Sequence, residues 1–210
     1  MKRLQMAPEE ADIVDLTHAA EGVARIDGKT VFVADALPGE RVVLRRTHRQ
    51  RKLDYAVTEQ VLRASPDRVQ PKCPHFGLCG GCALQHLAPD AQLAFKQSQL
   101  IENLSRLGAV HAGRLLEPLR GPVWNYRRRA RLGIKLVPRK GKVLVGFRER
   151  SSPYVADLHE CRVLAPPADR LIDPLAALVG ELSIAARVPQ VEVAVAGSDL
   201  PPRRWFTKRR

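Results

Sequence analysis

The spacing of four cysteines is the feature of this sequence that most constrains its fold. Cys73, Cys79 and Cys82 form a C-x5-C-x2-C pattern, and Cys161 lies far downstream. Three glycines lie within the short loop, and a residue without a Cβ lets the backbone wrap closely around a common centre. Thiols at this spacing act as metal ligands more often than as disulfides in a reducing compartment. The pattern therefore predicts a metal centre that joins one short loop to a distant segment.

Two kinds of metal centre compete for these thiols. Structural zinc sites usually take two CxxC pairs, so that each short loop gives two ligands. Three cysteines on one loop with a remote fourth are more typical of a cubane iron–sulfur cluster. We therefore predict a [4Fe–4S] cluster, with zinc or redox-active thiols as the alternatives. His75 and His86 flank the loop, but four thiolates complete the ligand set without them. Four cysteines also leave no iron open to substrate, which favours a structural or redox-sensing role over radical catalysis.

The first third of the chain consists of short alternating segments separated by turn signals. Asp27-Gly28 is a strong hairpin signal, and Pro38-Gly39 marks another turn. Four or five short strands between residues 12 and 62 predict a small closed barrel of OB type. The segment 41–52 holds six basic and no acidic residues, Arg45 and Arg46 among them. It is a candidate phosphate-facing edge, with a solvated charged turn as the alternative.

The rest of the chain mixes helices and strands. The spacing predicts a helix over 89–107 whose apolar stripe packs in the core, a β-hairpin over 126–147, a helix over 169–182 interrupted near Pro174, and a strand over 190–196. The stripe consists of Leu93, Gln97, Leu100, Ile101, Leu104 and Leu107.

Charge points to a polyanionic partner. Lys and Arg number 35 against 22 Asp and Glu, which gives a net charge of +13, while the apolar content of 45% is that of a folded chain. Between Arg120 and Arg150 there are eleven basic residues and one acid. Nucleic acid is the partner that such a concentration favours, and a charged face in solvent is the alternative. The candidate RNA contacts there are Arg127, Arg128, Arg129 and Arg131.

No stretch is apolar enough to span a membrane, and the first residues lack the apolar core of a secretory signal. We therefore expect a cytoplasmic protein that needs no membrane, and the sequence shows no sign of an obligate protein partner.

Four stretches resemble a known family. They are EGVARIDGKTVFVADALPGE at 21–40, CPHFGLCGGCALQH at 73–86, WNYRRRARLGIKL at 124–136 and VGFRERSSPYVADLHEC at 145–161. Together they resemble the 23S rRNA uracil-5-methyltransferases, the iron–sulfur members of the RNA m5U methyltransferase family. The resemblance covers residues 11–196.

The resemblance implies a mainly β fold with α+β parts. Residues 11–65 would be a TRAM-like, five-stranded OB barrel that binds RNA, and residues 70–200 an incomplete iron–sulfur domain. Cys73, Cys79, Cys82 and Cys161 would ligate the [4Fe–4S] cluster, and 23S rRNA would be the partner. In the family, a C-terminal Rossmann-like domain binds S-adenosylmethionine. A cysteine of that domain attacks C6 of a flipped-out uracil, because C5 alone is a poor nucleophile.

The sequence departs from the family at one point. It contains no glycine-rich nucleotide-binding turn, and the cluster accounts for all four cysteines, so we assign no catalytic residue. We expect a methyltransferase chain truncated before its Rossmann-like domain and inactive alone, with residues 201–210 a basic tail read out of frame. The alternative is a standalone iron–sulfur RNA-binding module without catalysis, with a genuine basic tail.

Overall fold

The computed structural model describes residues 7–197, and the chain forms two compact units, Met1–Arg120 and Gly121–Arg210. The cysteine loop and the helix after it are grouped with the barrel in the first unit, whereas the sequence suggests a division near residues 65–70. The expected basic tail at 201–210 lies outside the described residues. No helix among residues 7–197 is long and apolar enough to cross a membrane.

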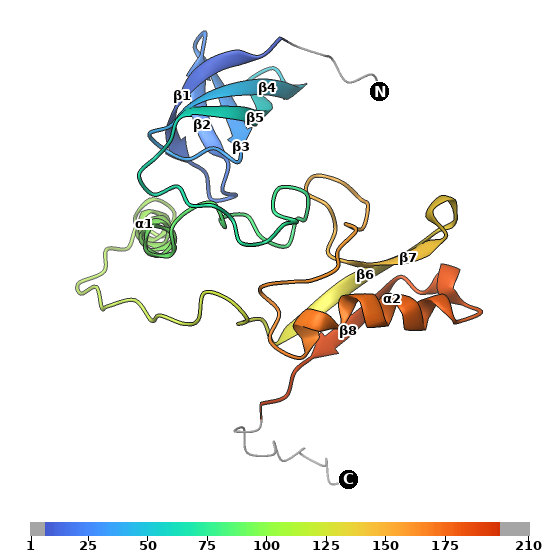
Figure 1. Ribbon diagram of the computed structural model, residues 1–210. Coiled ribbons are helices and arrows are strands. Elements are labelled where there is room, and N and C mark those ends of the chain that lie inside the picture. Colours follow the sequence, from blue (N-terminus) through green and yellow to red (C-terminus); the bar gives the residue numbers. More distant parts are fainter. Residues whose placement is uncertain (1–6, 198–210) are drawn as a thin grey trace. The chain divides into compact units, whose positions relative to one another are not determined.

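Five strands of the first unit form a closed barrel in the order β1-β2-β3-β5-β4 (Figure 1). The strands are β1 (Glu9–Leu16), β2 (Gly22–Ile26), β3 (Lys29–Ala34), β4 (Arg41–Arg49) and β5 (Leu53–Arg63). Strands β3 and β5 pair in parallel, and the other neighbours are antiparallel. The predicted five-stranded OB-like barrel is thus confirmed.

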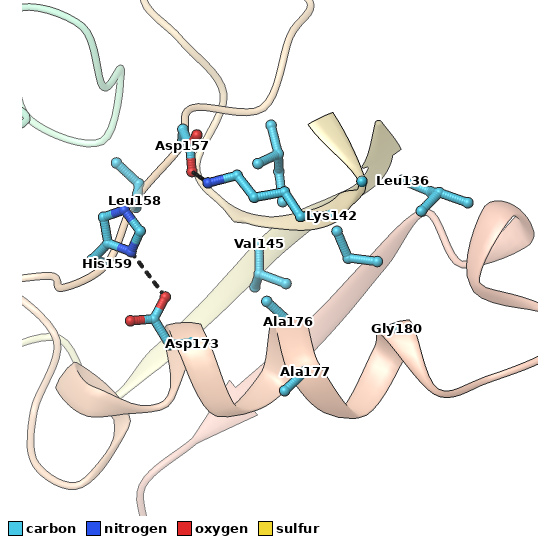
Figure 2. A pocket seen from close by; sticks show the side chains of 13 residues that line it. Leu136, Lys142, Val145, Asp157, Leu158, His159, Asp173, Ala176, Ala177 and Gly180 are labelled. Carbon is cyan, nitrogen blue, oxygen red and sulfur yellow. Dashed lines mark hydrogen bonds and ion pairs between the residues drawn. The ribbon is translucent and has the colours of Figure 1, made fainter. Parts of the chain in front are cut away.

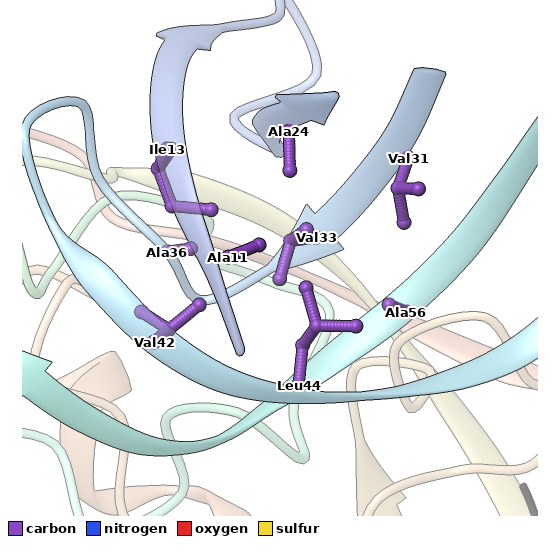
Figure 3. Packing of buried hydrophobic residues seen from close by; sticks show 9 residues of the cluster. All are labelled: Ala11, Ile13, Ala24, Val31, Val33, Ala36, Val42, Leu44 and Ala56. Atoms are coloured by element: carbon purple, nitrogen blue, oxygen red, sulfur yellow. The ribbon is translucent and has the colours of Figure 1, made fainter. Parts of the chain in front are cut away.

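Small and β-branched side chains fill the barrel (Figure 3). Alternate positions on each strand point inward, so one strand contributes Val31 and Val33 while Phe32 faces the other side. Asp27 and Gly28 have φ values of 50° and 76°, the two positive angles that a tight hairpin turn requires. The core consists of Ala11, Ile13, Ala24, Val31, Val33, Ala36, Val42, Leu44 and Ala56.

One wall of the barrel contains a fully buried carboxylate, Asp54. It accepts hydrogen bonds from Lys29 Nζ at 2.7 Å and from Arg46 Nη1 at 2.6 Å, and the Gln50 amide donates to it at 3.2 Å. Burial by itself raises the pKa of Asp54, but these hydrogen bonds outweigh it and hold the pKa below its ordinary value. The carboxylate is therefore ionised in the folded barrel.

Acid should weaken the barrel through this group. Because the folded pKa of Asp54 is lowered, its contribution to stability is present above the unfolded pKa of about 4 and is lost as pH falls through the folded value. We expect Asp54→Asn to destabilise the barrel at pH 7 and the difference from the wild-type chain to shrink below about pH 4. Urea unfolding at pH 7 and pH 3 measures this. Asp27→Asn in the exposed hairpin turn is the control, and an equal deficit for Asp54→Asn at both pH values would contradict the assignment.

Helix α1 (Pro89–Arg106) begins at the predicted residue, with Pro89 in its first turn, and ends one residue before the predicted Leu107. The prediction that its apolar stripe lies in the core is wrong, since α1 has no buried residue. Leu100 is 59% exposed, and Leu107, just after the helix, is 84% exposed. Periodicity identifies an apolar face, but whether another element covers that face depends on tertiary packing.

The second unit is a three-stranded antiparallel sheet, ordered β7-β6-β8, with helix α2 packed against β7. Its elements are β6 (Arg129–Val137), β7 (Lys142–Gly146), α2 (Ile172–Gly180) and β8 (Gln190–Ala194), with short 3-10 turns at Pro138–Lys140, Ala168–Arg170 and Ala185–Arg187. Pro174 lies in the first turn of α2 and does not interrupt it, because the first amides of a helix need no partner within the helix. The predicted helix over 169–182 is therefore a 3-10 turn followed by α2.

Glycines let a further segment cross this sheet. A Cβ on Gly146 would lie 2.8 Å from Leu158 Cδ1 and 2.9 Å from the Ala156 carbonyl oxygen, and one on Gly133 would lie 3.0 Å from Val155 Cγ2. Gly133 and Gly146 are paired across β6 and β7. The two glycines therefore form a notch that seats the segment leading to Cys161.

Candidate metal-binding loop and RNA-binding surface

The cysteine loop belongs to the first unit, and hydrogen bonds between its two ends close it. The Val69 amide donates to the His86 carbonyl oxygen at 2.9 Å, and the Ala88 amide donates to the Asp67 carbonyl oxygen at 2.8 Å. These bonds hold the two ends of the loop together just before α1. The three loop cysteines are therefore carried on a segment with fixed ends.

Tight turns shape the loop between those ends. The Cys79 amide donates to the His75 carbonyl oxygen at 2.9 Å, and Gly77 between them has a φ of +90°, which favours glycine. The Gly81 amide lies 3.4 Å from Cys79 Sγ and donates to it. Amide hydrogen bonds to sulfur are among the protein's means of tuning a bound iron–sulfur cluster.

A partly buried ion pair ties the base of the loop to the barrel. Glu40, which has no exposed area, accepts from Arg68 Nη2 at 2.8 Å and from the amides of Leu37 at 2.8 Å and Ser65 at 3.2 Å. Burial raises the pKa of Glu40, but the Arg68 guanidinium and the two amides outweigh it, and the pKa is lowered. Glu40 is thus an ionised carboxylate that links barrel and loop.

Cys161 belongs to the second unit and is buried, whereas the three loop cysteines are partly buried. Its amide donates to the Asp169 carbonyl oxygen at 3.4 Å. Among residues 7–197, no three His, Cys, Asp or Glu side chains are grouped so as to hold a metal ion. A cubane binds each thiolate to a different iron, so its ligands need not converge on a single atom. The donor set fits a cluster chemically, and the four-cysteine ligand set stays a prediction.

Strand β6 carries the basic face that its alternation predicts. Ala130, Leu132 and Ile134 are buried, whereas the side chains of Arg129 and Arg131 are 76% and 64% exposed. The structure therefore brings two of the four predicted arginines onto one face of the sheet.

The other two arginines lie just before β6. The guanidinium of Arg127 lies over the Phe147 ring, 5.4 Å from its centroid, which is a cation–π contact. Arg128 is exposed, its carbonyl oxygen accepts from the Val195 amide at 2.7 Å, and its side chain lies beside Gly197.

The two arginines predicted as RNA contacts on the barrel differ in their exposure to solvent. Arg46 is 8% exposed and is held by Glu9 at 2.5 Å and Asp54 at 2.6 Å. These ion pairs, the hydrogen bond to Glu9 first, raise the pKa of Arg46 despite its burial. Its guanidinium is bound by these two carboxylates inside the barrel wall, so we no longer count Arg46 among the candidate RNA contacts. Arg45 pairs with Glu59 at the surface, where its side chain is 37% exposed, and it remains a candidate.

The second unit contains a groove of about 350 Å³ that no sequence motif predicted (Figure 2). Helix α2 contributes Ala176 and Ala177 to its lining. Its polar members form two pairs, Lys142 with Asp157 at 2.8 Å and His159 with Asp173 at 3.0 Å. Hydrogen bonds from Lys142 and then Lys140 lower the pKa of Asp157. The residues that line the groove come from separate segments, so no local motif could have predicted it.

Comparison with known proteins shows which proteins this chain resembles. The TRAM domain model matches residues 8–45. The chain is 52% identical over 184 residues to the 23S rRNA (uracil(1939)-C(5))-methyltransferase RlmD of Bordetella pertussis, covering 88% of this chain and 40% of that protein. It is 49% identical over 194 residues to the RlmD of Alkalilimnicola ehrlichii, covering 92% of this chain and 44% of that protein.

A solved structure is also similar. It is the tRNA (uracil-54, C5)-methyltransferase of Pyrococcus abyssi in complex with S-adenosyl-L-homocysteine, with a TM-score of 0.54 and 26% identity over 82% of this chain and 37% of that one. The chain thus spans about two fifths of the length of the relatives it matches. In sequence and fold, the part of the chain that matches is similar to the RNA m5U methyltransferases, above all to the 23S rRNA uracil-C5 members, and it carries a TRAM domain.

Proposed function

We propose that this chain is the RNA-binding part of an S-adenosylmethionine-dependent methyltransferase that methylates C5 of a uridine in 23S rRNA in the cytoplasm. The observation that carries the proposal is the exposed basic face of β6, in a chain that also carries a TRAM barrel. The names of the relatives supply the substrate, and the bound S-adenosyl-L-homocysteine of the Pyrococcus protein supports the methyl donor.

In this proposal the basic face binds the RNA backbone. Guanidinium groups match phosphate oxygens in charge and geometry, and each neutralised phosphate releases counterions. The exposed side chains of Arg129 and Arg131 are accessible to a strand of RNA, and Arg127 and Arg128 extend the same charge beyond the start of β6.

We also propose that Cys73, Cys79, Cys82 and Cys161 hold a [4Fe–4S] cluster. The amide of Gly81 donating to Cys79 Sγ, the closed loop and the burial of Cys161 support this assignment. When bound, the cluster would supply a structural or redox-sensing element. With all four thiols used as ligands, no nucleophile for methyl transfer is assigned to these residues.

Salt dependence tests the RNA surface. Arg129→Ala and Arg131→Ala should each weaken RNA binding and reduce the slope of log Kobs against log salt by up to about 0.7–0.9, because each removes one guanidinium group that contacts the RNA backbone. Fluorescence anisotropy of a labelled stem-loop of 23S rRNA in increasing KCl measures both quantities. Arg170→Ala, an exposed arginine of the same unit in the 3-10 turn before α2, is the control. Unchanged affinity and slope in both β6 variants would refute the surface.

A further inference from the structure

The basic face of β6 contains a carboxylate, Glu192 of β8. Glu192 is paired directly opposite Arg131 across the two strands, while Arg129 is opposite Ala194 and reaches Glu192 diagonally. Arg131 donates to Glu192 Oε1 from Nη2 at 2.7 Å and from Nε at 3.0 Å. Arg129 Nη2 donates to Glu192 Oε2 at 3.0 Å. One carboxylate therefore bridges two guanidinium groups, with a separate oxygen for each.

A phosphodiester has the same pattern of acceptors. It presents two anionic oxygens on one centre, and arginine binds carboxylate and phosphate through the same planar fork. The two arginines, already turned toward one anion, therefore form a site for a second. All three side chains are more than two fifths exposed, so an incoming phosphate can reach them from solvent.

The carboxylate stays charged at neutral pH. Hydrogen bonds and charge from Arg131, and then from Arg129, lower the pKa of Glu192. Protonation therefore does not remove it from the arginines under ordinary conditions, and an RNA phosphate must displace it.

We infer that Arg129 and Arg131 form a phosphodiester subsite and that Glu192 occupies it as an internal competitor of RNA. This inference rests on the proposed RNA-binding function. Exchange of Glu192 for a phosphate offsets part of the gain from each contact, because one ion pair is lost as another forms. The carboxylate thus weakens binding of single phosphates from any polyanion, and stable binding requires further contacts elsewhere on the RNA.

Neutralising Glu192 tests the inference. Glu192→Gln should tighten binding of the labelled stem-loop about three- to tenfold at low salt, because the arginines lose their competitor and the phosphate loses a like charge. The salt slope should steepen by up to about 0.7. Glu181→Gln, an exposed glutamate at the end of α2, changes the net charge equally and should change affinity much less. Exposed ion pairs contribute little to folding, so the variant should keep its melting temperature within a few degrees.

The same substitution in an Arg129→Ala/Arg131→Ala background separates the possible failures. There the gain from Glu192→Gln should fall to that of the Glu181→Gln control. Weaker binding of Glu192→Gln would overturn the inference, because the carboxylate would then orient the arginines. An equal gain in both backgrounds would also overturn it, since the effect would be one of net charge. If the double arginine variant itself binds RNA like the wild-type chain, the proposed surface fails instead.

Discussion

Replacement of Glu40 by glutamine is expected to lower the free energy of unfolding of the barrel by about 3 kcal/mol. Glu40 has no exposed area, and its two oxygens accept from Arg68 and from two backbone amides. Glutamine keeps the size of the side chain but replaces one acceptor oxygen with a donor and leaves Arg68 without its counter-charge. Removal of one partner of a buried pair costs far more than loss of a surface pair, because the remaining group stays desolvated.

Amide hydrogen exchange of Val31 and Val33, two buried barrel residues, measures this effect locally. Tryptophan fluorescence is unsuitable, because the segment 9–63 that forms the barrel strands contains no tryptophan. Glu59→Gln, which breaks a surface pair with Arg45, is the matched control and should cost less than about 1 kcal/mol. Similar losses in the two variants would show that the Glu40 pair does not stabilise the barrel. The Glu40→Gln variant should also loosen the cysteine loop, since Arg68 lies at the base of that loop.

Replacement of Cys82 or Cys161 by serine is expected to abolish the proposed cluster. A serine hydroxyl is far less acidic than a thiol, and its oxygen is a harder donor for iron, so we expect the cluster to be lost when one of its four thiolates is replaced. Anaerobically purified wild-type chain should contain about four iron and four acid-labile sulfide per chain, and each variant should contain almost none. Iron and sulfide assays with the visible absorption spectrum measure the loss.

His75→Asn is the control, because this loop histidine is not among the proposed ligands. Its backbone carbonyl, which accepts from the Cys79 amide, is kept in the variant. The variant should retain full iron and sulfide. If the wild-type chain contained zinc and no sulfide, the site would be a zinc site and the cluster proposal would be wrong. Retention of the cluster in Cys161→Ser would remove the remote cysteine from the ligand set.

Local patterns account for the elements that the sequence predicted well. The Asp27-Gly28 turn has the two positive φ values that its residues favour, and α1 begins at Pro89 as the proline indicates. The alternation in β6 correctly separated the buried Leu132 from the exposed Arg131. Each of these signals lies within a few residues, where backbone geometry is decided by the residues themselves.

The same patterns could not predict whether another element packs against a given face of a helix or strand. The apolar stripe of α1 has helical spacing, yet none of its residues is buried. Arg45 and Arg46 are adjacent in one basic segment, but alternation along β4 places one at the surface and the other in the barrel wall. A charge count over a segment therefore overstates the number of arginines that are available to RNA.

Local residue patterns were enough to predict the barrel strands, the alternating faces of the sheet, and the cysteine loop on which the cluster proposal depends. Which acid pairs with which base became known only from the folded chain. Arg46 meets Glu9 across 37 residues, Arg68 meets Glu40 across 28, and Arg131 meets Glu192 across 61. The physical reason is that periodicity fixes the side on which a residue lies, whereas its partner is fixed by strand register and by loop closure between distant segments.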